Sequence, residues 1–107
     1  MKRTLMCLAA ALCATAVQAD DLSRFIGYRI VAKKTIAGYV EEHGSARKSD
    51  TSFEGCDYDR KIIFTDNTYL TCRSYSYSYS YRPEAILLAN GSQWVMIVNG
   101  NTYEMSN

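Results

Sequence analysis

From residue 25 onward the chain contains short runs in which apolar and polar residues alternate. This period of two is typical of β-strands that bury one face, whereas an amphipathic helix repeats its apolar residues every three to four positions. Polar, turn-forming residues separate the runs. The pattern predicts six short strands, at residues 25–40, 60–65, 68–81, 85–89, 93–98 and 102–105.

Tight turns join most of these runs. Asn90-Gly91 and Asn99-Gly100 are among the strongest hairpin signals that a sequence offers, and Asp66-Asn67 marks a further turn. Hairpin connections make successive strands antiparallel neighbours. The sequence therefore predicts an all-β fold, a small antiparallel meander that closes into a five- to six-stranded barrel or a tight sandwich.

The first run is long, and it alternates with few interruptions. Tyr28, Ile30, Ala32 and Ile36 fall on one parity and predict a half-buried strand face. Its β-branched residues argue against a helix. Gly27 and Gly38 mark positions where the strand can bend or bulge.

Residues 41–52 lose the apolar alternation and are mostly charged or small and polar. A stretch of this composition between two strands is typical of a solvated loop. We therefore expect a mobile loop here rather than a further strand.

The two Asn-Gly turns allow the faces of the last three strands to be assigned. Centring the hairpins on them places Leu87 opposite Trp94 and Met96 opposite Tyr103. One face then collects the residues Leu87, Trp94, Met96, Val98, Tyr103 and Met105. We predict that this face is the core, because the opposite face would bury Glu104 without a partner. The opposite face also carries Ile86, Leu88, Val95 and Ile97, which need a cover from the first strand or from a partner protein.

The N-terminus has the features of a cleavable signal peptide. Lys2 and Arg3 precede an apolar run, and Val17-Gln18-Ala19 supplies the small residues of a cleavage site. The run is short for a membrane span, which takes about 20 residues. We predict a signal peptide at residues 1–19 and one β domain at residues 20–107, periplasmic or secreted and not inserted in the membrane after cleavage.

Cleavage would leave two cysteines, Cys56 and Cys72, which we expect to form a disulfide in an oxidising compartment. Closing a loop of this size is worth about 3 kcal/mol in the chain-entropy model. The twelve Lys and Arg residues include Lys2 and Arg3, so ten basic residues would face eleven acidic ones. A chain so balanced has no bulk attraction for nucleic acid.

Serine and tyrosine alternate from residue 74 to residue 81. Tyr75, Tyr77, Tyr79 and Tyr81, hereafter the tyrosine row, share one face of an extended chain. Tyrosine combines a large rigid ring with a hydroxyl group at little entropic cost. The row is therefore our candidate binding surface, suited to a glycan or an envelope protein.

The tyrosine row can instead belong to the core, and strand parity alone does not decide between burial and exposure. With unbroken alternation, Cys72 faces inward with the serines and the tyrosines face solvent, whereas one β-bulge near Arg73-Ser74 reverses this. Alternating large and small residues suit a barrel wall, so we favour burial of most of the row.

Chemistry-bearing motifs are scarce. The only histidine, His43, lies in a polar stretch where it is expected to be exposed, and no nucleophile or phosphate-binding motif occurs. Glu54, Asp57 and Asp59 cluster around Cys56, but their spacing does not fit a calcium loop, so a solvated acidic turn paired with Arg60 or Lys61 is expected. We predict no catalytic residue, metal or cofactor.

Three blocks, at residues 53–60, 79–85 and 96–105, resemble a group of small exported bacterial proteins of unknown function. The resemblance covers most of the predicted mature chain and implies no activity. The sequence thus favours an exported, non-enzymatic binding module of the bacterial envelope, whose ligand and oligomeric state it does not specify. The alternatives are a structural or stress-related periplasmic protein without a ligand, and a small hydrolase or metal-dependent enzyme.

Overall fold

A computed structural model describes residues 23–107, so the predicted signal peptide lies outside the described residues. The described chain forms seven β-strands, which are β1 (Arg29–His43), β2 (Ala46–Asp50), β3 (Lys61–Phe64), β4 (Tyr69–Cys72), β5 (Glu84–Asn90), β6 (Gln93–Val98) and β7 (Asn101–Ser106). No helix within residues 23–107 is long and apolar enough to cross a membrane.

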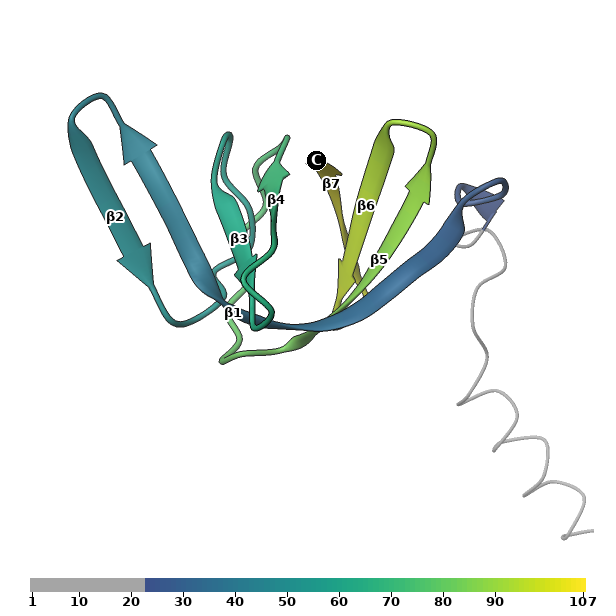
Figure 1. Ribbon diagram of the computed structural model, residues 1–107, viewed down its shortest axis with the longest axis horizontal. Coiled ribbons are helices and arrows are strands. Elements are labelled where there is room, and N and C mark those ends of the chain that lie inside the picture. Colours follow the sequence, from purple (N-terminus) through teal and green to yellow (C-terminus); the bar gives the residue numbers. More distant parts are fainter. Residues whose placement is uncertain (1–22) are drawn as a thin grey trace, which may run out of the picture.

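The predicted closed antiparallel barrel is confirmed. Neighbouring strands follow the order β2-β1-β3-β4-β7-β6-β5, and β1 also pairs with β5, so that six strands form a closed ring and β2 stands outside it. Closure depends on β1, which crosses the whole β domain beneath the other strands in Figure 1. Its residues 29–35 pair with β5, and residues 36–40 pair with β3.

Two irregularities in β1 change which side chains face the core. The register shifts between Ile30 and Ala32 and again between Ile36 and Gly38. As a result Ala32 and Ile36 face the core, as predicted, but Ile30 is 74% exposed, and its predicted burial is wrong. A β-bulge adds one residue to a strand and so reverses the inward parity beyond it, which is why Tyr39 is buried.

The prediction of a loop at residues 41–52 is wrong. β1 continues to His43, and β2 pairs with it from Tyr39↔Asp50 to His43↔Ala46. Every residue of β2 is exposed, so backbone pairing forms this strand without an apolar face, and hydrophobic alternation gives no signal for it. Figure 1 shows the β1–β2 hairpin projecting from the side of the barrel.

The Asn99-Gly100 hairpin has the predicted register, with Met96 opposite Tyr103. The preceding hairpin differs, because Asn90 pairs with Gln93 and the tip is Gly91-Ser92, so that Leu87 lies opposite Met96 rather than Trp94. A slip of two residues keeps every side chain on its face. The tryptophan face is therefore core, as predicted, with Trp94 partly buried at its margin.

The core combines this face with side chains from the other strands and from residues 53–56. Its largest fully buried members are Tyr39, Tyr103, Phe53 and Phe64. Phe53 packs edge-on against Tyr103, with ring centroids 5.5 Å apart. The predicted disulfide joins Cys56 to Cys72, both 1% exposed, with their Cα atoms 5.5 Å apart.

The turn between β3 and β4 supports a pH prediction at Asp66. The Lys34 ammonium, 2.8 Å from the Asp66 carboxylate, holds the pKa of that carboxyl well below its ordinary value, and hydrogen bonds from the Thr68 hydroxyl and N–H lower it further. Because folding depresses this pKa, the carboxylate contributes stability fully above about pH 4, and the contribution is lost as the pH falls through the folded-state pKa.

We expect Lys34→Met to raise the pKa of Asp66 towards its ordinary value, as measured by NMR titration of the side-chain carboxyl. Lys33→Met is the matched control, because Lys33 is more exposed and lies 3.4 Å from Glu84 instead. An unchanged Asp66 titration in Lys34→Met would contradict the assigned cause.

Candidate functional site

The tyrosine row lies on the connection between β4 and β5, outside the strands of the barrel. Residues 74–81 do not form a regular strand, but they contain two antiparallel bridges, Cys56↔Ser76 and Phe53↔Ser80. Each bridge exchanges two backbone hydrogen bonds of 2.8–2.9 Å. Four residues of one segment (53–56) therefore face five of the other (76–80), so the tyrosine segment carries one extra residue, as in a β-bulge.

Gly55 allows the two segments to lie this close. Its φ is +78°, and a Cβ atom built there would lie 2.1 Å from the Ser76 carbonyl oxygen and 2.7 Å from the Ser78 nitrogen. Both the positive φ and the missing side chain are therefore required. Gly55 and the two bridges together fix the backbone that carries the row.

The four tyrosines of the row point into solvent. Tyr75, Tyr77, Tyr79 and Tyr81 are 64%, 64%, 61% and 66% exposed. Our interpretation that most of the row is buried is wrong. Regular alternation holds from Cys72, which is buried, to Tyr75, which is exposed, and the bulged segment beyond Ser76 also exposes its tyrosines. The extra residue lies within the row rather than at Arg73-Ser74, and the barrel interior is filled by Phe53, Tyr39 and Tyr103.

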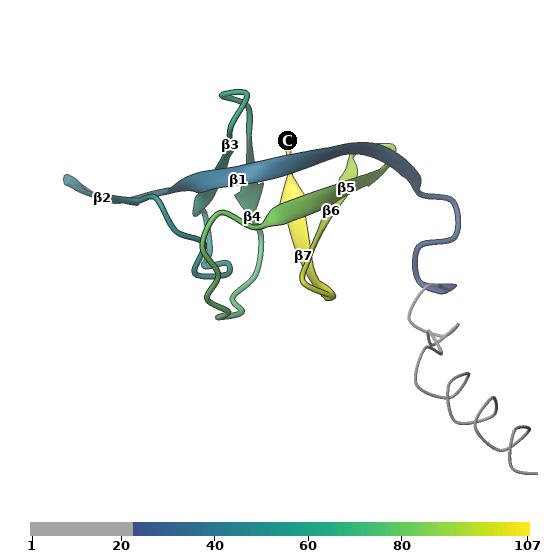
Figure 2. The same ribbon diagram turned by 90° about the horizontal axis from the view of Figure 1, so that it is seen from below.

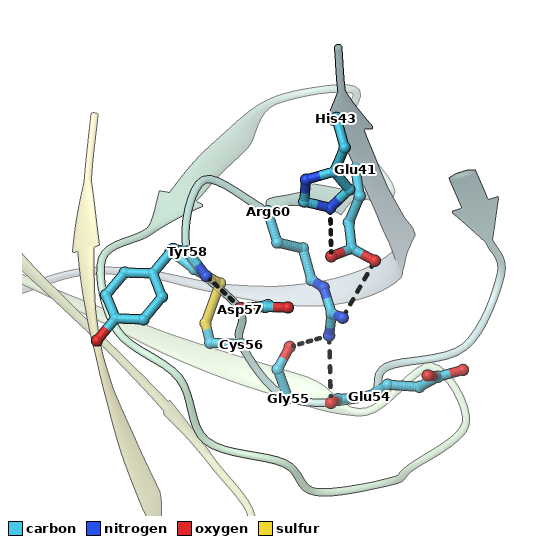
Figure 3. A network of polar contacts seen from close by, with 9 residues as sticks. Glu41, His43, Glu54, Gly55, Cys56, Asp57, Tyr58 and Arg60 are labelled. Atoms are coloured by element: carbon cyan, nitrogen blue, oxygen red, sulfur yellow. Dashed lines mark hydrogen bonds and ion pairs between the residues drawn. A yellow bond between two sulfur atoms is a disulfide. The ribbon is translucent and has the colours of Figure 1, made fainter. Parts of the chain in front are cut away.

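A buried ion pair lies beside the disulfide. The Arg60 guanidinium is 3.2 Å from the Glu41 carboxylate, and the two side chains are only 9% and 7% exposed. Nη1 of Arg60 also donates to the carbonyl oxygens of Glu54 and Gly55, both at 3.2 Å. In Figure 3 the guanidinium lies between Glu41 on one side and these two carbonyls on the other. Arg60 thus links the C-terminal part of β1, through Glu41, to the segment that supports the tyrosine row.

Aromatic packing completes this contact. The Arg60 guanidinium lies over the Tyr39 ring, with Cζ 4.3 Å from the centroid. Burial raises the pKa of the Tyr39 phenol above its ordinary value, although Lys48 offsets part of the effect. The ring is therefore neutral at physiological pH and presents its negative face to a desolvated cation.

The arrangement differs from the predicted acidic turn. Arg60 pairs with Glu41 rather than with Asp57 or Asp59, and Asp57 accepts a hydrogen bond from the Tyr58 N–H at 2.8 Å. Across residues 23–107, no group of three or more His, Cys, Asp and Glu side chains is placed to hold a metal ion.

His43 is exposed, as predicted, but it ends β1 rather than lying in a loop. Its Nε2 is 3.6 Å from Glu41, and its side chain is 66% exposed. Figure 3 shows His43 beside Glu41, on the side of that carboxylate away from Gly55 and Glu54.

The apolar face of β5 and β6 is largely covered by the chain itself. Leu88 and Val95 are each only 7% exposed, whereas Ile86 is 38% exposed. The turn at residues 23–28 lies against this side, where the Tyr28 hydroxyl donates to Gln93 at 2.9 Å and Phe25 lines a cavity with Val95. This face of β5 and β6 is therefore a weaker candidate for a binding surface than the tyrosine row.

Comparison with known proteins does not add a relative to this description. No family model matches the chain, and neither a curated protein nor a solved structure is detectably similar to it.

Proposed function

We propose that this protein is an exported, non-enzymatic binding module of the bacterial envelope, with the tyrosine row as its contact surface. The observation that carries the proposal is the exposure of all four tyrosines on a backbone that two bridges hold in place. Large rings on a rigid support lose little conformational entropy when they bind. Burying them in a complex would remove a large apolar area from water.

Export is supported by the sequence and is compatible with the disulfide. The N-terminal leader pattern and the resemblance to small exported bacterial proteins favour it. Structural disulfides persist in oxidising compartments and are rare in the cytosol of mesophiles. A buried disulfide joining the support of the row to β4 suits a protein that acts outside the cytoplasm.

The test is a double replacement, Tyr77→Ser with Tyr79→Ser. Both side chains are exposed, so the free energy of unfolding should change by no more than about 0.5 kcal/mol per site. Capture of envelope proteins and glycans by the immobilised protein should fall at least about tenfold, because aromatic anchors dominate contact surfaces of this kind. Tyr69→Ser is the matched control, since Tyr69 is 50% exposed but lies at the other end of β4.

The outcomes separate the proposal from its alternatives. Reproducible capture that survives the double replacement would overturn the tyrosine row as the contact surface. If neither the unaltered protein nor the double variant captures an envelope component, the hypothesis of a structural protein without a ligand replaces the proposal. A hydrolytic activity lost on replacing His43 or Asp57 would establish the enzyme instead.

A further inference from the structure

A polar groove runs beside the tyrosine row. Its wider part is a cavity of about 500 Å³ between the turn at residues 23–28 and the outer side of the β6–β7 hairpin, with Ser74 on its border. A second cavity of about 340 Å³ is bordered by Ser76 and Asn101. Both volumes lie within the range of about 300–1,000 Å³ that is typical of ligand sites.

Arg24 and Thr102 line both cavities and therefore lie where the two adjoin. Nη2 of Arg24 donates to Oγ1 of Thr102 at 2.7 Å, and its guanidinium carbon lies 5.1 Å from the centroid of the Phe25 ring. One hydrogen bond and one ring thus hold the guanidinium in place, while the group has five N–H donors in all. The groove has a positioned donor at its centre.

The tyrosine segment forms one wall of this groove with its serines. Ser74 and Ser76 border the cavities, so Tyr75, between them on an extended chain, extends from the opposite side of the same wall. In Figure 2 the connection between β4 and β5 and the tip of the β6–β7 hairpin project to the same side of β1. The groove therefore lies on the serine side of this segment, and the tyrosines of the row point away from it.

The chemistry of the lining indicates the kind of ligand. A guanidinium, a carboxylate (Glu104), an amide (Asn101) and several hydroxyl groups offer both donors and acceptors. The one positive and one negative charge balance, so neither an anion nor a cation is favoured as a whole. The aromatic side chains Phe25 and Tyr28, in edge-to-face contact 5.7 Å apart, add apolar surface at one end.

Sugars match this combination, because a pyranose ring has hydroxyl groups around its edge and an apolar C–H face that packs on aromatic rings. The centre of a protein–protein interface is instead depleted of charged groups. We propose, building on the binding function above, that this groove binds a neutral oligosaccharide on the serine side of the tyrosine segment. The hydroxyl groups of the sugar chain meet Arg24, Asn101 and the serines, and one ring face packs on the aromatic side chains of Phe25 and Tyr28.

The experiment is a titration of the protein of residues 20–107, oxidised at Cys56–Cys72, with defined tetrasaccharides, followed by amide chemical shifts. The neutral probes are chitotetraose, cellotetraose and maltotetraose, and tetragalacturonic acid is the anionic comparison. At least one neutral probe should shift the amides of residues 74–77 and 100–102, and should bind more tightly than the acid. Asn101→Ala and Phe25→Ala should each weaken that binding about fivefold to tenfold. Tyr75→Ala, whose ring points away from the groove, and Tyr69→Ser should leave it unchanged.

Three results would overturn the inference: no shift with any neutral probe, shifts confined to other surfaces, or a preference for the acid. The proposed function is tested separately. If envelope protein is still captured in a manner that needs Tyr77 and Tyr79, the binding module stands and its ligand is a protein rather than a glycan. If that capture is also absent, both proposals fail.

Discussion

Glu41→Ala should lower the free energy of unfolding by about 3–5 kcal/mol, the cost of leaving one member of a buried ion pair without its partner. Arg60 has almost no access to water that would replace the carboxylate 3.2 Å away, because its side chain is 9% exposed. Within residues 23–107 its Nε also has no hydrogen-bond partner, and Glu41 supplies the negative charge that compensates the guanidinium. Urea denaturation followed by circular dichroism measures the change.

Glu42→Ala is the control for this prediction. Glu42 follows Glu41 in β1 but is exposed and pairs with Arg47 in the strand ladder, so its removal should change stability by less than about 0.5 kcal/mol. A loss below about 1 kcal/mol for Glu41→Ala would show that Arg60 reaches solvent on its own.

Removing both charges should cost less than removing one. In Glu41→Leu with Arg60→Met no buried charge remains, and replacing buried ion pairs by apolar side chains is often close to neutral. Part of the loss should persist, because the carbonyl oxygens of Glu54 and Gly55 lose their donor. A double variant less stable than Glu41→Ala would mean that those two hydrogen bonds outweigh the ion pair.

The second large effect is expected from the disulfide. Replacing Cys56 and Cys72 by alanine should lower the free energy of unfolding by about 3 kcal/mol, which for a domain of this size is on the order of 10–25 °C in Tm. The bond joins residues 16 positions apart and packs against the core, with Sγ of Cys56 3.7 Å from Sδ of Met105. Thermal unfolding with and without a reductant gives the same comparison in the unaltered chain.

Loss of the disulfide should also loosen the tyrosine row more than the barrel. Cys56 is the residue that exchanges two backbone hydrogen bonds with Ser76, so the protection of the Ser76 amide against hydrogen exchange should fall more than that of the amides of β6. Equal losses at both places would show that the bond stabilises only the fold as a whole.

The barrel could be predicted from the sequence because its evidence is local. Hydrophobic alternation marks β5, β6 and β7, and Asn-Gly signals fall beside their turns. At residues 90–92 two turn signals overlap, Asn90-Gly91 and Gly91-Ser92, and the second forms the tip. The two turns give strand registers that differ by two residues, and such a shift leaves each side chain on the same face of the sheet. The predicted core residues are therefore correct although the predicted register is wrong.

The ion pair and β2 could not be predicted, because both depend on the shape of β1. Glu41 faces inward only because the bulge before Gly38 reverses the parity of the strand, and a Cβ atom on Gly38 would lie 2.1 Å from the Asp50 carbonyl oxygen. The sequence marks Gly38 as a possible bulge but does not say that one forms. β2 has no buried face, so only its backbone pairing identifies it.

The tyrosine row shows a different limit. Parity counted from Cys72 gives the correct exposure of Tyr75, but it does not account for the tyrosines beyond the extra residue between Ser76 and Ser80. The analogy with a barrel wall gives the wrong exposure for the whole row. That analogy assumes that the alternating segment is a wall strand, but the wall closes without it, through β4–β7 and β1–β5 pairing. The pairing that closes the barrel depends on the whole chain, so the eight residues 74–81 alone do not show whether they belong to its wall.

Because β1 pairs with both β3 and β5, it affects the rate at which the barrel can close during folding. β1 is the first of the described strands and β5 the fifth, and Arg29 must pair with Ala89 before the ring is closed. Pairings between segments so far apart in sequence slow folding, because the entropy of closing the loop is lost before the contacts form. Until β5 pairs, β1, the longest of the strands within residues 23–107, would have an open edge through residues 29–35, and unpaired strand edges of this kind favour aggregation.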